Sequence, residues 1–258
     1  MSVITSHFDE GVLTLTLNRP SVFNSFNREM ALQLQTELDR CATDDLIRAI
    51  VITGEGKAFC AGQDLTEATD PDGPELQQIV ADHYNPIILK IRTLEKPVIA
   101  AVNGVAAGAG ANIALACDIV IAKESASFIQ AFSKIGLIPD SGGTFMLPRL
   151  IGIQKAMALM LTADKVSAQD AERMNMIYKA VADDNFNEMI NDFAKKMAQM
   201  PTKGLGLTKR ALNASLDNSL ENQLKLEEIL QTEAGKSHDF QEGVAAFLEK
   251  RNPIFKGN

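Results

Sequence analysis

Two stretches of the chain combine glycine and alanine at places where a strand should meet a helix. They are residues 54–65 (GEGKAFCAGQDL) and residues 102–116 (VNGVAAGAGANIALA). Glycine and alanine let a ligand approach the backbone closely, and the first turn of a helix has amide hydrogens without an internal partner. Two such turns side by side would direct their amides at one anion. The alternative is that the small residues only allow close helix packing.

A third stretch, residues 132–152 (FSKIGLIPDSGGTFMLPRLIG), contains one aspartate in largely apolar surroundings. This residue, Asp140, lies between a proline and a Ser-Gly-Gly segment. In an apolar pocket the pKa of a carboxyl group rises, which suits proton transfer near neutral pH. Aspartate is also a common N-cap of a helix. The local sequence leaves both roles open for Asp140.

Motifs of several other chemistries are missing. The glycines of the second stretch fit neither the phosphate-binding GxxxxGK[ST] pattern nor the dinucleotide GxGxxG pattern, and the chain has no GxSxG nucleophile motif. The histidines and cysteines show no metal-ligand spacing. They are His7, His83, His238, Cys41, Cys60 and Cys117. We therefore expect no metal or redox site, and buried thiols at the three cysteines.

The residues around these stretches alternate between strand and helix patterns. Residues 12–17 (VLTLTL) have the period-two alternation of a half-buried strand, and residues 47–53 form a β-branched run typical of a strand buried on both faces. Between them, an apolar stripe with helical spacing consists of Met30, Leu34, Leu38 and Cys41. Helix, strand, helix and strand patterns then follow over residues 79–94, 98–102, 108–117 and 119–122. Strands that alternate with helices predict an α/β core.

The carboxyl-terminal third of the chain shows helix patterns and few strand signals. Residues 167–170 (SAQD) resemble a capping box, and an apolar stripe over 186–197 predicts a helix. Three more helices are predicted over 206–216, 220–233 and 240–250. We predict a core over residues 1–200 that carries the chemistry, and a helical region over 201–258 that packs on the core or on another subunit. Residues 66–78, rich in turn formers, are a candidate lid.

The composition of the chain limits the classes of protein to which it can belong. Its 258 residues are 46% hydrophobic and 22% charged, an ordinary globular balance. The formal net charge of -8, spread without long like-charged runs, argues against nucleic-acid binding. The apolar stretches are far shorter than the roughly 18 residues that a membrane span needs, and the amino terminus has no basic segment followed by an apolar run. We expect a cytoplasmic protein without membrane or nucleic-acid partners.

Taken together, these stretches resemble the crotonase (enoyl-CoA hydratase/isomerase) family across nearly the whole chain. The core motifs that carry the resemblance are LNRPSVFNSFN, AFCAGQDL, KPVIAAVNGVAAGAGANIALACDIVIA and GLIPDSGGTFMLPRLIG. Two further segments, SAQDAERMNMIYKAV and EGVAAFLEKRNPIFKG, resemble the helical tail of the family. The order and spacing of all six motifs are far more specific than any single glycine pattern.

The resemblance implies a fold, a substrate class and an assembly. The fold would be an α/β core of repeated ββα units with a helical carboxyl-terminal trimerisation region. The chain would assemble as a homotrimer or as a dimer of trimers. The substrate would be an acyl-CoA thioester, and coenzyme A would enter as part of that substrate. No separate cofactor is therefore expected.

The resemblance also implies roles for individual residues. In the family two main-chain amides form an oxyanion hole for the thioester oxygen, and they match Gln63 and Ala109. Contacts with the substrate or its coenzyme A match Ala61, Gln63, Asp64, Leu65 and Gly108. The two glutamates with which hydratases activate water match Asn112 and Phe132, which would line the substrate pocket and cannot act as bases. Asp140 matches the acid/base carboxylate of a subset of isomerases.

These matches predict isomerisation rather than ordinary hydration. The resemblance is greatest to family members of phenylacetate catabolism that convert ring-epoxidised phenylacetyl-CoA to an oxepin thioester. A Δ3,Δ2-enoyl-CoA isomerase or an atypical hydratase is the alternative, because one carboxylate suffices for either isomerisation. A third hypothesis is a catalytically silent member that only binds coenzyme A esters. The apolar surroundings of Asp140 argue against that third hypothesis.

Overall fold

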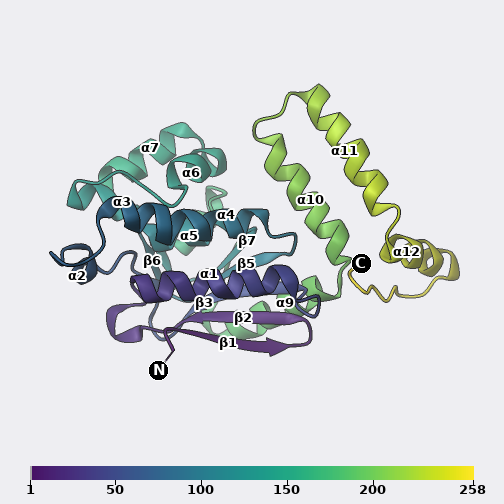
Figure 1. Ribbon diagram of the computed structural model, residues 1–258, viewed down its shortest axis with the longest axis horizontal. Helices are drawn as coiled ribbons and strands as arrows, with labels where there is room; N and C mark the ends of the chain where they lie inside the picture. The colour runs from purple at the N-terminus through teal and green to yellow at the C-terminus, as the bar shows by residue number, and fades with distance from the viewer. Residues whose placement is uncertain (1) are drawn as a thin grey trace.

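The main sheet of the computed structural model, which describes residues 2–258, has six strands in the order β1-β2-β3-β5-β7-β10 (Figure 1). These strands are β1 (Ile4–Asp9), β2 (Val12–Leu17), β3 (Ala49–Gly54), β5 (Val98–Val102), β7 (Ile119–Lys123) and β10 (Lys179–Val181). β1 and β2 pair antiparallel, and the other neighbours pair parallel. The strands predicted over 12–17 and 98–102 are confirmed, and the one predicted over 47–53 begins two residues later, at Ala49.

A second sheet has four strands in the order β4-β6-β8-β9. They are β4 (Ala58–Cys60), β6 (Val105–Ala107), β8 (Ser127–Ile129) and β9 (Lys165–Ser167). Each of β4, β6 and β8 directly follows a strand of the main sheet, and a helix comes next, so the predicted repeat of ββα units is confirmed. The corners between the sheets are tight, since a Cβ on Gly104 would lie 2.1 Å from the carbonyl oxygen of Lys57.

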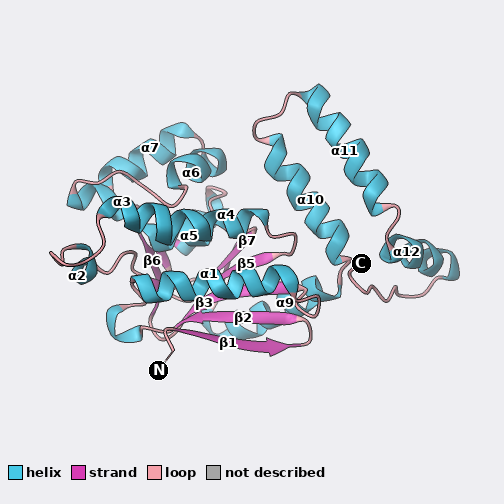
Figure 2. Ribbon diagram, in the orientation of Figure 1, coloured by secondary structure: helices cyan, strands magenta, loops and turns pink. Residues whose placement is uncertain are grey.

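Helices of very different length connect the strands (Figure 2). Before the carboxyl-terminal region they are α1 (Arg28–Thr43), α2 (Leu65–Ala68), α3 (Leu76–Gln78), α4 (Asn85–Thr93), α5 (Ala109–Ala116), α6 (Gly143–Ile151), α7 (Ile153–Thr162), α8 (Ala168–Arg173) and α9 (Phe186–Gln199). Three 3₁₀ turns, η1 (Pro20–Val22), η3 (Ala131–Ile135) and η4 (Asp183–Asn185), and one π-helical turn, η2 (Ile79–Tyr84), complete the set. In α1 the Asn27 side chain caps the amide of Met30 at 3.0 Å, and the predicted apolar stripe is buried.

The two faces of the main sheet are covered by different helices. Leu13 and Ile50 point into the larger core, to which α1, α4 and α5 contribute buried side chains. Val12 and Val51 point to the opposite face, where they pack with α9. Because both faces of β3 are buried, its sequence is a continuous apolar run rather than an alternating one.

Three helices extend beyond the α/β core at one end of the molecule (Figure 1). They are α10 (Thr202–Ser215), α11 (Leu220–Ala234) and α12 (His238–Glu249). All three are predicted from the sequence, but α10 begins at Thr202 rather than at residue 206. Pro201 occupies its N-cap, where the missing amide hydrogen costs nothing. Within residues 2–258 we find no helix of the length and apolarity that a membrane span requires.

The prediction of helices with few strand signals in the carboxyl-terminal part misses two strands. β9 and β10 both lie in the carboxyl-terminal part, and each forms an edge of its sheet. Each has three residues, too few to show a period-two pattern. Ser167 is nevertheless the predicted N-cap of α8, since its side chain accepts the amide hydrogen of Asp170.

Candidate active site

The glycine turns that follow β4 and β6 lie side by side. Gly62 has a φ of +99° and Gly108 a φ of +53°, conformations that favour glycine. A Cβ on Gly62 would lie 3.0 Å from the carbonyl oxygen of Ala107 and 3.6 Å from the amide nitrogen of Ala109. The pairing of β4 with β6 therefore brings the two glycine and alanine stretches of the sequence to one place.

Each of the two turns leaves a main-chain amide free at the place where they meet. Ala109 is the first residue of α5, where amide hydrogens have no partner inside the helix. On the other turn the amide of Phe26 donates to Gly62 at 2.7 Å, and the amide of Asp64 donates to Phe26 at 2.8 Å, which fixes the peptide between them. For the amides of Gln63 and Ala109 we find no acceptor among residues 2–258. These are the two amides that the family resemblance assigns to an oxyanion hole.

Cys60 holds the two turns together. Its Sγ accepts the amide hydrogen of Gly62 at 3.4 Å. A Cβ on Gly110 would lie 2.4 Å from the carbonyl oxygen of Cys60 and 2.7 Å from its Sγ, so glycine at position 110 lets α5 approach β4 closely. Burial raises the pKa of the Cys60 thiol to about 12, which keeps it neutral. All three cysteines are free and buried, as predicted.

Asp140 is not the N-cap of a helix. The helix that follows it, α6, begins at Gly143 with Gly142 as its N-cap, and no side chain caps it. The carboxylate of Asp140 instead accepts a hydrogen bond of 2.9 Å from the hydroxyl of Ser141. Burial raises the pKa of Asp140 above its ordinary value, and the bond from Ser141 only partly opposes this shift. The N-cap alternative is wrong, and a carboxylate with a raised pKa suits proton transfer.

Asn112 connects the segment that carries Asp140 to α5. Its Nδ2 donates to the carbonyl oxygen of Asp140 at 2.8 Å, and its Oδ1 accepts from Gln130 at 2.8 Å. A Cβ on Gly143 would lie 2.3 Å from Asn112 Nδ2, so glycine is needed there as well. Ala109 and Asn112 lie one turn apart on the same helix. The free amide and the carboxylate are therefore positioned by one rigid element.

The other residues matched to the family have different surroundings. Phe132 is buried beside the second turn, with its Cζ 3.9 Å from a Cβ built on Gly108. Ala61 and Leu65 are exposed on either side of the first turn. Their contacts with coenzyme A stay predictions, as does the lining of the substrate pocket by Phe132 and Asn112.

Asp64 fixes the start of α2. Its carboxylate accepts the amide hydrogen of Thr66 at 3.0 Å and pairs with Arg19 at 2.8 Å. Burial of Asp64 opposes ionisation, but the bonds from Arg19 and Thr66 prevail and lower its pKa. Asp64 is therefore an ionised structural group of the first turn, and its predicted contact with the substrate stays a prediction.

Tyr84 is a residue of the site that the sequence did not indicate. Its hydroxyl donates to Oε1 of Gln63 at 2.7 Å. The side chain is 1% exposed and lies at the end of the π-helical turn η2. The sequence signal is weak, because η2 and α4 together read as one helix interrupted at Pro86.

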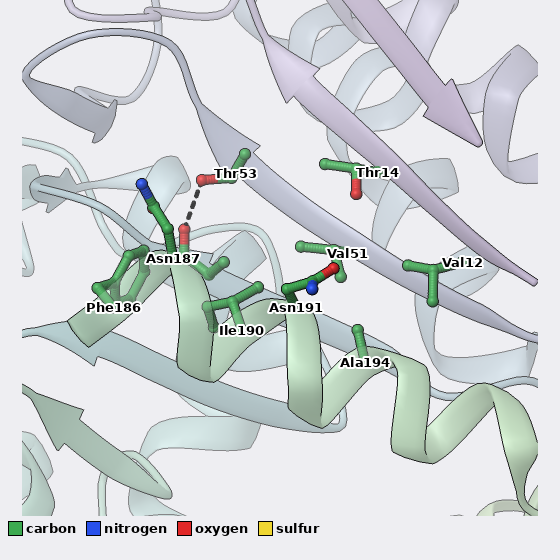
Figure 3. A pocket seen from close by; sticks show the side chains of 10 residues that line it. Val12, Thr14, Val51, Thr53, Phe186, Asn187, Ile190, Asn191 and Ala194 are labelled. Atoms are coloured by element: carbon green, nitrogen blue, oxygen red, sulfur yellow. Dashed lines mark hydrogen bonds between the residues drawn. The ribbon is translucent and has the colours of Figure 1, made fainter. Parts of the chain in front are cut away.

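A cavity of about 210 Å³ lies elsewhere, between α9 and the main sheet (Figure 3). Its lining consists of Val12, Thr14, Val51, Thr53, Ala101, Phe186, Asn187, Ile190, Asn191 and Ala194. No lining residue is ionisable, and the hydroxyl of Thr53 already donates to the carbonyl of Ala101 at 2.8 Å. This cavity has no group for acid/base chemistry and opens on the face of the sheet opposite to α5.

Comparison with known proteins finds relatives that match the chain over nearly its whole length. A sequence profile of the enoyl-CoA hydratase/isomerase family matches residues 7–258. The chain is 50% identical to 1,2-epoxyphenylacetyl-CoA isomerase of Escherichia coli, over 100% of this chain and 99% of the relative. It is 37% identical to 2,3-dehydroadipyl-CoA hydratase of the same organism, over the full length of both.

Solved structures agree with the sequence relatives. The structure of enoyl-CoA hydratase from Bacillus anthracis superposes with a TM-score of 0.92 at 33% identity, covering 99% of this chain and 100% of that one. Enoyl-CoA hydratase from Mycobacterium smegmatis superposes with a TM-score of 0.93 at 30% identity, covering 99% of both chains. The chain belongs to the enoyl-CoA hydratase/isomerase, or crotonase, family.

Proposed function

We propose that the chain is an isomerase of acyl-CoA thioesters, with Asp140 as acid/base and the amides of Gln63 and Ala109 as oxyanion hole. One observation carries the proposal. Asp140 is a carboxylate with a raised pKa, tied through Asn112 to the helix whose first amide is free. The positions at which hydratases have glutamates hold Asn112 and Phe132, neither of which can accept a proton as a general base.

The chemistry follows from these groups. A thioester whose oxygen accepts two amide hydrogen bonds is more acidic at its α-carbon, because the negative charge of the enolate lies on that oxygen. Asp140 takes the α-proton and becomes a carboxylic acid. It then returns the same proton to another carbon of the substrate. Substrate and product have the same composition, so the reaction consumes no water and needs no cofactor beyond the coenzyme A of the substrate itself.

The substrate that we propose is 1,2-epoxyphenylacetyl-CoA. The support is the 50% identity to an isomerase of that name over nearly the full length of both proteins. Loss of the α-proton, cleavage of the bond shared by the epoxide and the six-membered ring, and return of the proton to a ring carbon give a seven-membered oxepin thioester. All three steps need only one carboxylate and an oxyanion hole.

A second candidate is a Δ3,Δ2-enoyl-CoA isomerase or atypical enoyl-CoA hydratase. It is favoured by the 35% identity to a trans-2-decenoyl-[acyl-carrier-protein] isomerase of Streptococcus mutans and by the 37% identity to a hydratase. In a linear 3-enoyl-CoA, Asp140 would move a proton from C2 to C4 and bring the double bond into conjugation. A silent family member that binds coenzyme A esters without turnover is the third candidate.

The helical region formed by α10, α11 and α12 is the proposed site of subunit assembly. Two grooves of about 920 Å³ and about 600 Å³ run along α10, α11 and α12. Several large apolar side chains of α11 and α12 are exposed in the single chain: Leu220, Leu224, Ile229, Phe240, Phe247 and Leu248. Exposed apolar surface of this extent is typical of a subunit interface. We propose that these helices assemble the chain into a homotrimer or a dimer of trimers.

A product assay tests the function. The wild-type protein is given ring-epoxidised phenylacetyl-CoA and, in parallel, a linear 3-enoyl-CoA, and the products are resolved by chromatography and mass spectrometry. Isomerisation leaves the mass unchanged, whereas hydration adds one water. A higher kcat/KM for the epoxide supports the proposal, and turnover of the linear thioester alone supports the second candidate. Tight binding of both without turnover identifies a silent protein.

A further inference from the structure

We infer that Tyr84 is a positioning residue of the oxyanion hole, which holds the Gln63 peptide in place through the Gln63 side chain. The inference rests on the proposed function, because it assigns Tyr84 a role in the same site. Tyr84 acts through Gln63 and needs no contact with the substrate.

Both ends of the Gln63 side-chain amide are held by other elements. Its Oε1 accepts the Tyr84 hydroxyl at 2.7 Å, and its Nε2 donates to the carboxylate of Glu67 at 3.1 Å. The same carboxylate accepts the main-chain amide of Arg28 with distances of 2.9 and 3.1 Å. The side chain of Gln63 is thus bonded directly to η2 and α2, and through Glu67 it is connected to the first turn of α1. A main-chain amide whose own side chain is fixed at both ends has little freedom to rotate.

The position of Tyr84 follows from the π-helical turn that it ends. Pro86 has no amide hydrogen and its ring crowds the carbonyl four residues earlier, which belongs to Asp82. The helix widens at this point, and the amide of Asn85 donates to Val80, five residues back. Gln35 of α1 donates to the freed carbonyl of Asp82 at 2.7 Å. Such turns are rare and are often found at functional sites.

The surroundings of Tyr84 keep its hydroxyl protonated. Burial raises its pKa well above the ordinary value, and the neighbouring Cys60, Asp140 and Glu67 add to the shift. The hydroxyl therefore remains a hydrogen-bond donor over the whole range of pH in which the protein would work. The ring packs at 5.9 Å, centroid to centroid, against Phe26, whose backbone holds Gly62 and Asp64 on either side of Gln63.

The first test is Tyr84→Phe, which keeps the ring and removes the hydroxyl. Complete loss of one oxyanion donor costs about 10² to 10³ in kcat, so loosening of the donor should lower kcat by about tenfold. KM for the acyl-CoA and the melting temperature should stay near the wild-type values. Tyr178→Phe is the matched control, since Tyr178 is the second of the two tyrosines and is 61% exposed. Equal kcat values for Tyr84→Phe and wild type would overturn the inference.

A double-mutant cycle shows whether Tyr84 acts through Gln63. Gln63→Leu keeps the main-chain amide and removes the acceptor of the Tyr84 hydroxyl. Gln63→Leu with Tyr84→Phe should then be no slower than the slower single variant. If the fold-losses of kcat in the two single variants multiply in the double variant, Tyr84 acts independently of Gln63, which would overturn the inference. If Tyr84→Phe does not fold, Gln63→Leu must show the same tenfold loss for the inference to stand.

A vibrational measurement separates this inference from the proposed function. The carbonyl stretch of an unreactive, ¹³C-labelled saturated acyl-CoA should shift to lower wavenumber on binding to wild type, and less so on binding to Tyr84→Phe. Equal shifts in both proteins overturn the role of Tyr84 and leave the oxyanion hole intact. Bound thioester without any shift in wild type overturns the oxyanion hole and, with it, both proposals.

Discussion

The carboxyl group of Asp140 determines how activity should depend on pH. It must be ionised to take the α-proton, and burial raises its pKa above the ordinary value of about 3.9. We expect kcat/KM to fall as the pH is lowered through this raised pKa, so the acidic limb of the profile should lie above pH 4. Initial rates measured across a pH series, at saturating and at limiting substrate concentration, give this profile. A flat profile down to pH 4 would contradict the role of Asp140 as base.

At the scale of residues, the sequence predicts the groups that lie in contiguous motifs but not the contacts that join them through space. Gln63, Ala109 and Asp140 are each part of a glycine-rich stretch, and the resemblance of these stretches to the family assigns Gln63, Ala109 and Asp140 their predicted roles. The bond from Tyr84 to Gln63 spans 21 positions and that from Asn112 to Asp140 spans 28. No local pattern marks such pairs, because they form only when the helices pack.

At the scale of elements, α5 is the one whose position matters most for the oxyanion hole. Gly110→Ala would place a Cβ 2.4 Å from the carbonyl oxygen of Cys60, so α5 must move away and carry the amide of Ala109 with it. We expect kcat to fall by about 10² while the protein remains folded, since a shift of about 1 Å has an effect of that size.

Gly204→Ala is the matched control for this change. Gly204 also lies inside a helix, but a Cβ there would meet nothing closer than 3.8 Å. Alanine should leave activity unchanged and stabilise the helix by about 1 kcal/mol. Steady-state kinetics and thermal unfolding of both variants check the pair. Wild-type turnover in Gly110→Ala would show that the approach of α5 to β4 does not position the amide.

The docking of α10 on the core depends on a buried charge. Lys209 Nζ lies 2.7 Å from Asp118 Oδ2 and 2.6 Å from the carbonyl oxygen of Ile91. Lys209→Met leaves the buried Asp118 with the more distant Arg92 as its cationic partner, so we expect a loss of about 3 kcal/mol in the free energy of unfolding.

The control is an exposed pair on a neighbouring helix. Lys225→Met breaks the bridge to Glu221, in which both side chains are well exposed, and should cost less than about 1 kcal/mol. Urea unfolding measures both variants. Equal losses would contradict the idea that burial, rather than the presence of an ion pair, makes Lys209 important.

The elements of the core were largely predictable, and the exceptions have a common cause. α1 and β3 have strong apolar patterns because each buries one or two complete faces in the core. β9 and β10 were missed because three residues at a sheet edge make few contacts and carry no periodicity. The start of α10 is predicted too late, since the first five residues of this helix contain two glycines and little apolar signal.

At the scale of the whole molecule, assembly should depend on the exposed face of α12. Leu248→Asp changes a side chain that is 75% exposed in the single chain, so the subunit should still fold. A charge in a subunit interface should nevertheless prevent assembly. Sedimentation or light scattering should show a trimer or hexamer for wild type and a smaller species for the variant.

A second exposed leucine provides the control for assembly. Leu46 is 71% exposed and lies between α1 and β3, far along the chain from the helical region. Leu46→Asp should form an assembly of the same mass in solution as the wild type. The account of assembly would fail if both variants kept that mass, or if wild type were monomeric.

The most direct measurement is the turnover of Asp140→Asn with its binding of acyl-CoA determined in parallel. Asparagine keeps the shape of the side chain but cannot take a proton, so isomerisation should fall by several orders of magnitude while the dissociation constant for the acyl-CoA stays near that of wild type. Asp164→Asn, the same change at an exposed position, should retain full activity. Near-wild-type turnover by Asp140→Asn would contradict the account, because the site would then be left without a base.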